Sequence, residues 1–181
     1  MRIIAGSARR TSLTAPKGLD TRPTTDMAKE NLFNILAGEI VDARFLDLFC
    51  GSGAIGLEAL SRRAKEVVLV ENAKAAITAT RHNIAKTKLP AQLLELPAAK
   101  AIEKLAADGR VFDIIFLDPP YETNLLAETF KLLARTNLLG SGGLLIAETD
   151  SKIPPPDTPE SLELIDTRIY GRTCFLFYTK L

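Results

Sequence analysis

The chain has little of what metal centres, disulfide frameworks and membrane spans require. Its 181 residues include one histidine and two cysteines, and Cys50 and Cys174 lie far apart without metal-ligand spacing. We therefore expect reduced thiols and no metal site. No apolar run approaches the roughly 18 residues of a membrane helix, and the amino terminus lacks the long apolar segment of a secretory signal. We expect a cytoplasmic protein without a membrane partner.

The overall composition is that of a soluble globular protein. Hydrophobic residues make up 46% and charged residues 25% of the chain, which argues against a disordered or fibrous protein. A chain of this length can bury an apolar core in one unit. We expect residues 1–181 to form a single domain and to act as a monomer.

Positive charge is concentrated at the amino terminus. The net charge is only +1, but residues 1–29 hold six basic and two acidic side chains, which leaves −3 for the rest of the chain. A basic arm over residues 1–25 can dock on phosphate while the acidic body keeps the protein soluble. Charge alone nevertheless favours a solvated, partly flexible terminus.

Strand-like and helix-like patterns alternate along most of the chain. In the first predicted helix, residues 26–36, an apolar stripe leaves Lys29, Glu30 and Asn34 mostly on the other face. Alternation of this kind predicts an α/β fold with a mostly parallel, doubly wound sheet. The predicted strands are 44–49, 66–71, 92–96, 112–118 and 143–148, and the predicted helices after the first end near 62, 86, 107 and 135.

The end of the chain breaks this alternation. Two strand-like runs, residues 162–170 and 173–181, flank Gly171 and Arg172 with no helix between them. This arrangement predicts a hairpin that adds antiparallel strands at one edge of the sheet.

A glycine-rich turn lies between the first predicted strand and the next helix. Gly51, Gly53 and Gly56 have the spacing G-x-G-x-x-G, and Glu71 ends the following strand 20 residues after Gly51. The glycines permit a tight turn and close approach of a ligand, and Glu71 can accept hydrogen bonds from both ribose hydroxyls. The pair predicts an adenosine-containing cofactor, although glycines that only pack the helix against its strand remain an alternative.

One carboxylate distinguishes between possible cofactors. Asp47 precedes the glycines, where it would repel the pyrophosphate of a nicotinamide dinucleotide but attract a cation. S-adenosylmethionine carries an ammonium and a sulfonium group. The presence of Asp47 therefore favours S-adenosylmethionine over a nicotinamide dinucleotide as the predicted cofactor.

The segment "FLDPPY" ends the strongest predicted strand at the same sheet edge. Asp118 supplies a carboxylate, and Pro119 and Pro120 supply carbonyl oxygens without N–H donors. Such an acceptor cluster suits the exocyclic amine of guanine or adenine, and Tyr121 offers a ring on which the base can stack. The segment therefore predicts a pocket that orients a planar amine for methyl transfer. A proline-stiffened surface turn is the alternative.

With these residues in place, the sequence resembles the class I S-adenosylmethionine-dependent amino-methyltransferases. More narrowly, it is similar to the bacterial 16S rRNA guanine-N2 methyltransferase D family. The resemblance covers nearly the whole chain and is carried by "MRIIAGSARR", "RPTTDMAKENLFNIL", "FLDLFCGSGAIGLEALSR", "LVEN", "FLDPPY" and "YGRTCFLFY".

The resemblance implies a seven-strand Rossmann-like sheet with an antiparallel last strand. It also implies methylation of guanine N2 in 16S rRNA, within the small ribosomal subunit or its assembly intermediate. Catalytic, base-orienting roles fall on Asp118, Pro119, Pro120 and Tyr121. Cofactor-binding roles fall on Arg22, Pro23, Thr24, Asp47, Phe49, Gly51, Gly53, Glu71, Asn72 and Asp118. Arg2, Arg9 and Arg10 become candidate RNA phosphate contacts.

The chain departs from the family pattern at one position, and two other functions remain open. Family members tend to have an acid after the third strand for the cofactor's adenine amine, whereas this chain has Pro97 in "LELPAA". The acceptor cluster also fits an N6-adenine DNA methyltransferase, although the short chain leaves little room for a target-recognition region. A non-catalytic RNA-binding module with this fold is the other alternative.

Overall fold

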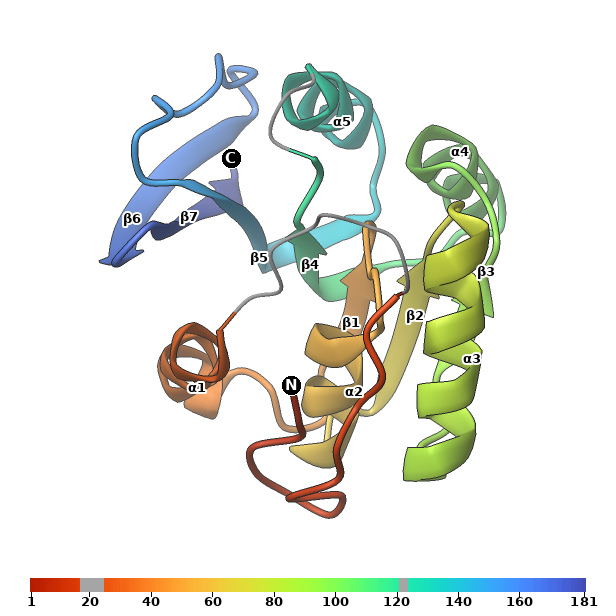
Figure 1. Cartoon of the computed structure of the whole chain (residues 1–181). Coiled ribbons are helices and arrows are strands. Elements are labelled where there is room, and N and C mark those ends of the chain that lie inside the picture. The colour runs from red at the N-terminus through yellow and green to blue at the C-terminus, as the bar shows by residue number, and fades with distance from the viewer. Residues whose placement is uncertain (17–24, 121–123) are drawn as a thin grey trace.

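A computed structural model of the chain describes residues 1–16, 25–120 and 124–181. Seven strands form one sheet, and helices cover both of its faces (Figure 1). Within the described residues, no helix is long and apolar enough to cross a membrane. In chain order the elements are α1 (Asp26–Ile35), a 3-10 turn (Leu36–Gly38), β1 (Arg44–Asp47), α2 (Ala54–Ser61), β2 (Glu66–Val70), α3 (Lys74–Thr87), β3 (Gln92–Leu94), α4 (Ala98–Ala107), β4 (Phe112–Leu117), α5 (Leu125–Ala134), β5 (Leu139–Asp150), β6 (Leu162–Tyr170) and β7 (Thr173–Lys180).

The strand order is β3-β2-β1-β4-β5-β7-β6. Neighbouring strands from β3 to β5 pair in parallel, whereas β7 pairs antiparallel with β5 on one side and β6 on the other. The chain leaves β1 toward β2 and later returns to β1's other side through β4. Beyond the carboxyl ends of β1 and β4 lies the crevice where open α/β sheets bind ligands.

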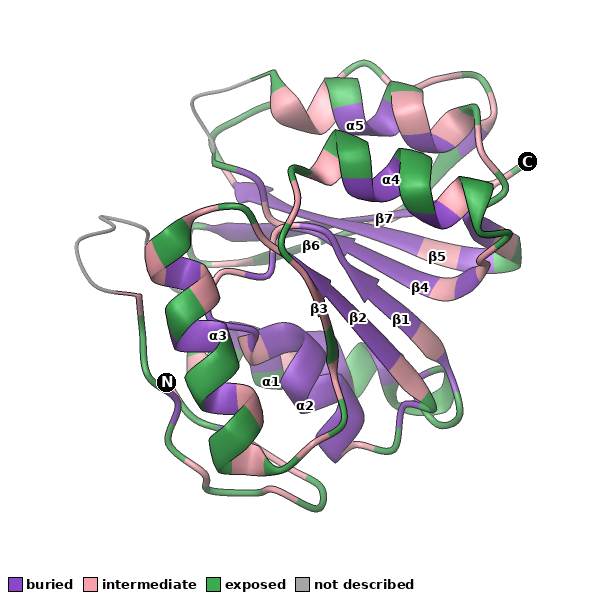
Figure 2. Cartoon of the chain, turned by 90° about the vertical axis from the view of Figure 1, so that its right-hand side faces the viewer, coloured by how far each residue is buried: buried purple, intermediate pink, exposed green. Residues whose placement is uncertain are grey.

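The sheet is buried on both faces because alternate strand residues point to opposite sides. In Figure 2, α4 and α5 lie above the strands, and α1, α2 and α3 lie below them. Leu46, Ile115 and Leu145 pack with α4 and α5, while Phe45, Ile114 and Ile146 pack with α1 and α2. This two-faced core holds the strand ends, and therefore the crevice, in a fixed arrangement.

The predicted elements are confirmed in type and order, with differences in strand bounds. β5 begins at Leu139, four residues before the predicted start, because Leu139 already pairs with Phe112. The predicted hairpin adds two antiparallel strands at one edge of the sheet, with β7 beside β5 and β6 at the edge. The antiparallel last strand that the family resemblance implies is thus confirmed.

The amino-terminal segment is folded against the domain. Residues 1–16 run along α2 to a turn beyond its last residue and back (Figure 1). Arg2 bridges to Ser12 in antiparallel fashion, and Ile3 and Leu13 are buried together with Leu57 of α2. The solvated, flexible terminus that charge alone favours is therefore wrong for residues 1–16. Widely spaced apolar residues within a basic segment give too weak a periodic signal to predict this packing.

Candidate active site

The turn after β1 is held between both neighbouring strands. The backbone N–H of Leu48 donates to the carbonyl of Phe116 at 3.1 Å, and that of Cys50 donates to the carbonyl of Val70 at 3.0 Å. The hydroxyl of Thr80, from α3, donates to the carbonyl of Gly51 at 2.6 Å. The turn is therefore preformed at the carboxyl ends of β1, β2 and β4.

Two glycines of the motif serve different purposes. Gly51 has φ +54°, a left-handed backbone that favours glycine, and a Cβ at this position would meet no atom within 4 Å. At Gly56 a Cβ would lie 2.3 Å from Cδ2 of Leu69, so α2 can pack closely on β2 only because no side chain intervenes. The packing alternative is right for Gly56, while Gly51 leaves open space for a ligand.

Glu71 links the turn to α3. One carboxylate oxygen accepts from the N–H of Gly51 at 2.9 Å, and the other accepts from the N–H groups of Asn72 at 2.8 Å and Ala73 at 2.9 Å. The side chain thus fixes its own position beside the turn. Glu71 is only half-buried, and the oxygen bonded to Gly51 accepts a single hydrogen bond, so this oxygen can also accept from a ribose hydroxyl.

Asp47 is a buried carboxylate whose hydrogen bonds are missing. The residue is 1% exposed, and neither carboxylate oxygen has a hydrogen-bond partner within the described residues. Burial raises the pKa of Asp47 to about 7. The N–H groups of Gly56 and Phe49 face the carboxylate without regular hydrogen-bond geometry and partly oppose this rise. The negative charges of Glu71 and Glu148 reinforce it. A buried acid without partners is costly, so this site fits a cation that the described residues do not supply.

Asp118 and Glu148 complete the acidic cluster. Asp118 follows β4 directly; the residue keeps some surface, but its carboxyl group is removed from solvent. This desolvation raises the pKa of Asp118 well above the ordinary value, and Glu148 and then Asp47 reinforce the rise. Glu148 is 2% exposed on β5, where Ala147 pairs with Leu117 of β4. Three buried carboxylates therefore interact with one another near the carboxyl ends of β1, β4 and the parallel part of β5.

Sequence reasoning missed Glu148. The rule that placed Asp118 at the crevice, an acid at the carboxyl end of a strand in a parallel sheet, applies equally to Glu148 in "GLLIAE". The signal was present in the sequence, because the predicted strand 143–148 ends at Glu148, although β5 itself continues to Asp150.

Several predicted site residues lie outside the described residues or away from the acidic cluster. Arg22, Pro23, Thr24 and Tyr121 are outside the described ranges. Pro119 is buried and Pro120 exposed next to Asp118, while Phe49 is half-buried and Asn72 is exposed beside the turn.

The position after the third strand carries no acid directed at the crevice. Pro97 is exposed and its carbonyl accepts the first backbone hydrogen bond of α4, from Ala101. The nearby acid Glu95 is bonded to Arg81 of α3. The departure from the family pattern therefore persists in the structure.

The basic arm divides into two parts. Arg2 pairs with Asp26 at the start of α1, with 3.1 Å between Nε and Oδ2. Arg9 and Arg10 are exposed in the turn at the far end of α2 from the glycine turn. The structure does not bring these arginines together with Asp47 and Asp118.

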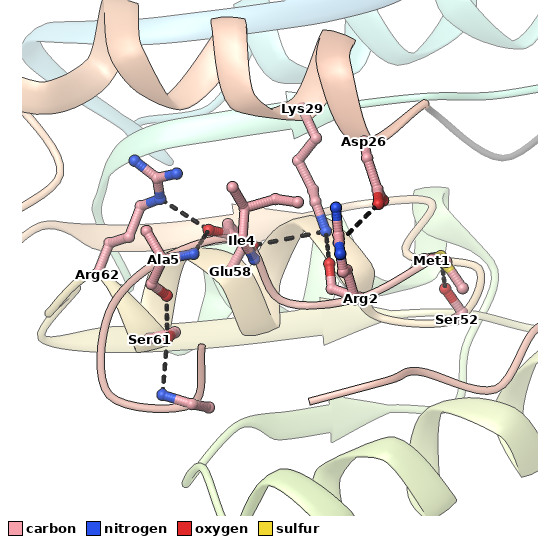
Figure 3. Close-up of polar contacts among 11 residues, drawn as sticks. Met1, Arg2, Ile4, Ala5, Asp26, Lys29, Ser52, Glu58, Ser61 and Arg62 are labelled. Carbon is pink, nitrogen blue, oxygen red and sulfur yellow. Dashed lines mark hydrogen bonds and ion pairs between the residues drawn. The ribbon is translucent and has the colours of Figure 1, made fainter. Parts of the chain in front are cut away.

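A second buried acid, Glu58 of α2, holds the amino-terminal segment in place (Figure 3). Its carboxylate accepts from the N–H groups of Ile4 at 2.7 Å and Ala5 at 3.0 Å and from Nε of Arg62 at 2.8 Å. Nζ of Lys29 lies 3.5 Å from the same carboxylate. We call Glu58 with these four partners the Glu58 network.

Lys29 was predicted to lie away from the apolar face of α1, and this prediction is wrong. The residue is 1% exposed; its Nζ donates to the carbonyl of Arg2 and faces Glu58. Desolvation lowers the pKa of Lys29, and Glu58 opposes the shift. The network thereby joins α1, α2 and residues 2–5 beside the crevice.

Comparison with known proteins identifies the family. The family model described as Conserved hypothetical protein 95 matches residues 1–179. The ribosomal RNA small subunit methyltransferase D of Escherichia coli K12 is 37% identical over 180 residues, covering 99% of this chain and 90% of that protein. The protein of the same name from Haemophilus influenzae is 35% identical, covering 98% and 93%. The chain belongs to this family.

A solved structure supports the same relationship. A hypothetical protein of Thermus thermophilus superposes with a TM-score of 0.86 at 32% sequence identity, covering 100% of this chain and 99% of that one. The similarity therefore extends over the whole sheet and its helices and is not restricted to the glycine motif of the family.

Proposed function

We propose that this protein is an S-adenosylmethionine-dependent methyltransferase that modifies the N2 amine of a guanine in 16S rRNA. The observation that carries the proposal is Asp47, a buried carboxylate without hydrogen bonds to the described residues, beside a preformed glycine turn. Membership of the small-subunit methyltransferase D family supports the choice of substrate.

The residues of the crevice fit the cofactor. Asp47 offers a carboxylate to its ammonium group, Glu71 offers acceptors to its ribose, and Gly51 leaves room for its close approach. Phe49, Gly53 and Asn72 belong to the same turn or the next one, and Arg22, Pro23 and Thr24 are proposed contacts on the strength of the family motif. When bound, the cofactor supplies an electrophilic methyl group on a sulfonium.

Asp118 with the two prolines is proposed to orient the base. An oxygen acceptor beside the exocyclic amine holds one of its N–H groups and turns the nitrogen lone pair toward the methyl group. Asp118 and Asp47 regain their carboxylate forms when a cation lies beside them, because an opposite charge lowers the pKa. The Asp118 carboxylate can therefore accept a hydrogen bond from the base amine once the cofactor is bound. Tyr121 is the proposed surface on which the base stacks.

Catalysis in this proposal is positioning and electrostatics. The amine gains a methyl group and loses one proton, and the Asp118 carboxylate is the acceptor nearest to that proton. Burial raises the pKa of the adjoining Cys50 thiol well above its ordinary value, so no thiolate nucleophile competes for the methyl group.

The proposed partner is 16S rRNA in the small ribosomal subunit or its assembly intermediate. Arg2, Arg9 and Arg10 are proposed phosphate contacts. We further propose a single domain over residues 1–181 that acts as a monomer in the cytoplasm, where assembling ribosomal subunits are found.

Methyl transfer from tritiated S-adenosylmethionine tests the proposal. Small ribosomal subunits, naked 16S rRNA and DNA are incubated in parallel, and the labelled nucleosides are then separated. N2-methylguanosine from ribosomal material is the expected product, and the better labelled of the two RNA substrates identifies the physiological form. Labelled N6-methyladenine in DNA, or no label despite measurable cofactor binding, contradicts the proposal.

A further inference from the structure

Five exposed basic side chains lie at the ends of α2 and α3 that are remote from the glycine turn and in the neighbouring turn of residues 6–11. The turn of residues 6–11 brings Arg9 and Arg10 to the end of α2, because the N–H groups of Ser7 and Ala8 donate to Ser61. Nζ of Lys86, near the end of α3, donates to the hydroxyl of Ser12 at 2.9 Å. We define the distal basic surface as Arg9, Arg10, Arg63, Lys86 and Lys88.

The three segments are held together by a small apolar cluster beneath this surface. Ile3, Leu13 and Leu57 are buried there, and Ala8, Ile84 and Leu89 pack against them. Figures 1 and 2 both show the amino-terminal turn below the last turns of α2 and α3. The charges are therefore carried by a packed part of the protein whose relative positions are fixed.

The basic side chains of this surface lack the ion pairs that some exposed basic residues elsewhere form, although others such as Lys74 and Lys131 also have none within the described residues. On other helices and strands, Lys100, Lys104 and Arg168 each pair with an acid within four residues along the chain. Within the described residues, none of the five members of the distal basic surface has an ion pair at 4.0 Å or less. The acid at its border is Asp42, whose N–H donates to the carbonyl of Arg63.

The backbone gives a second, independent observation. Four non-glycine residues of the described chain have a left-handed backbone, and three belong to the distal basic surface: Arg10 at φ +70°, Arg63 at φ +74° and Lys88 at φ +58°. A residue with a Cβ atom adopts this conformation at a steric cost, whereas glycine adopts it readily. A basic side chain at all three positions is therefore the less stable choice for the backbone, which indicates that the charge itself has a use.

We propose that the distal basic surface binds the RNA backbone at a distance from the methylated base. The inference rests on the proposed function, since it assumes an RNA substrate. α2 has eight residues and so spans about 12 Å, which separates this surface from the crevice by about four nucleotides of a stacked strand. The surface therefore holds phosphates on one flank of the target, outside the reacting nucleotide.

RNA is the partner that this chemistry fits best. The members are lysines and arginines without an aromatic side chain among them, so phosphates are the contacts that all five can make. The remainder of the chain beyond residue 29 carries −3, which repels a polyanion elsewhere and orients it onto this surface. Contacts of this kind add affinity and salt sensitivity without sequence choice.

The left-handed positions supply variants that keep the fold. Arg10→Gly, Arg63→Gly and Lys88→Gly remove three charges while giving the backbone the residue it favours, so the combined variant should melt within a few degrees of the wild type. The matched control is Asp42→Gly, at the fourth left-handed position (φ +62°), which removes an acid from the border of the same surface.

Affinity for 16S rRNA is measured at several salt concentrations, with affinity for S-adenosylhomocysteine and the melting temperature measured in parallel. The combined variant should bind RNA at least about tenfold more weakly at low salt, with a log–log salt slope shallower by about 2. Asp42→Gly should bind RNA as tightly as the wild type or more tightly. Cofactor affinity should not change in either variant.

Two results would overturn the inference. The first is an unchanged RNA affinity and salt slope in the combined variant while the wild type methylates guanine in 16S rRNA. The second is binding of polyglutamate to the wild type as tightly as RNA, which would assign the surface to polyanions in general. Failure of the proposed function is distinct from both, because it appears as absence of N2-methylguanosine with the wild-type enzyme.

Discussion

Two acids of this protein are equally hidden from solvent but differ in their partners. Glu58 is 0% exposed and accepts three hydrogen bonds, with Lys29 as an ion-pair partner. Asp47 is 1% exposed, has no hydrogen bond to its carboxylate within the described residues, and has a pKa raised to about 7. The two carboxylates lie on consecutive elements, at the end of β1 and in α2.

The difference in partners indicates a structural role for Glu58 and a ligand-binding role for Asp47. A buried charge whose partners are complete stabilises the arrangement of the segments that supply those partners. A buried charge without partners costs stability, and it is retained where a ligand supplies what is missing. Glu58 therefore accounts for the placement of the amino-terminal segment and α1, while Asp47 accounts for the attraction of a cationic cofactor.

The largest expected effect on activity comes from Asp118, the acid of the cluster that is proposed to contact the reacting amine. Asp118→Ala should lower kcat for methyl transfer by about 10³-fold or more, because it removes an acceptor that acts chiefly in the transition state. Affinity for S-adenosylhomocysteine, measured by calorimetry, should stay within about tenfold. Asp113→Asn, at the other end of β4, is the control and should keep its activity. Full turnover by Asp118→Ala would remove Asp118 from the mechanism.

Breaking the Glu58 network should cost stability and spare the chemistry of the crevice. Glu58→Gln leaves the buried Lys29 without its counter-charge and should lower the free energy of unfolding by about 3 kcal/mol. For a chain of this size the melting temperature should then fall by about 10 °C.

Two further variants sharpen this test. Lys29→Met in the Glu58→Gln background should recover part of the loss, because it removes the uncompensated charge. Glu103→Gln, whose partner is an exposed lysine, should change the free energy of unfolding by less than about 0.5 kcal/mol. A Glu58→Gln protein as stable as the wild type would mean that the network does not hold the amino-terminal segment.

Asp47→Asn should change stability and binding in opposite directions. The folded-state pKa of Asp47 lies above the ordinary value of 3.8, so its contribution to stability is present below pH 4 and is lost as pH rises through about 7. The shift corresponds to roughly 4 kcal/mol at pH 8, and burial of the unpaired amide of Asn offsets part of it. Without its cofactor, the variant should therefore be more stable than the wild type at pH 8, by roughly 1–2 kcal/mol. Its affinity for S-adenosylhomocysteine should fall by about tenfold. Equal losses of stability and affinity would instead indicate an ordinary structural acid.

The fold was largely predictable because its signals are local. The helix α4 ends at Ala107 and the strand β6 spans residues 162–170, both as predicted, since helical and strand periodicity lie within the segments themselves. The position of β7 between β5 and β6 depends on pairing between distant segments, which a periodic pattern does not encode.

The site residues that could be predicted from the sequence are acids whose place at the end of a strand or before the glycine turn indicates their role. Asp118 was found because acids at the carboxyl ends of parallel strands meet at one edge of the sheet, and Glu148 could have been found in the same way. Asp47 was found because it directly precedes the glycine turn, where a carboxylate attracts a cation. Lys29 and Glu58 could not, because a lysine or glutamate in a helix is usually exposed, and only the tertiary structure brings these two together.

Proton release on ligand binding tests the contrast most directly. S-adenosylhomocysteine is titrated into the protein at pH 7 by calorimetry in buffers of different ionisation enthalpy. With a pKa of about 7, Asp47 is about half protonated before binding, so the wild type should release about half a proton more than Asp47→Asn does. Equal proton release by the two proteins would contradict the account. It would mean that Asp47 does not lose a proton when the ligand's ammonium group binds.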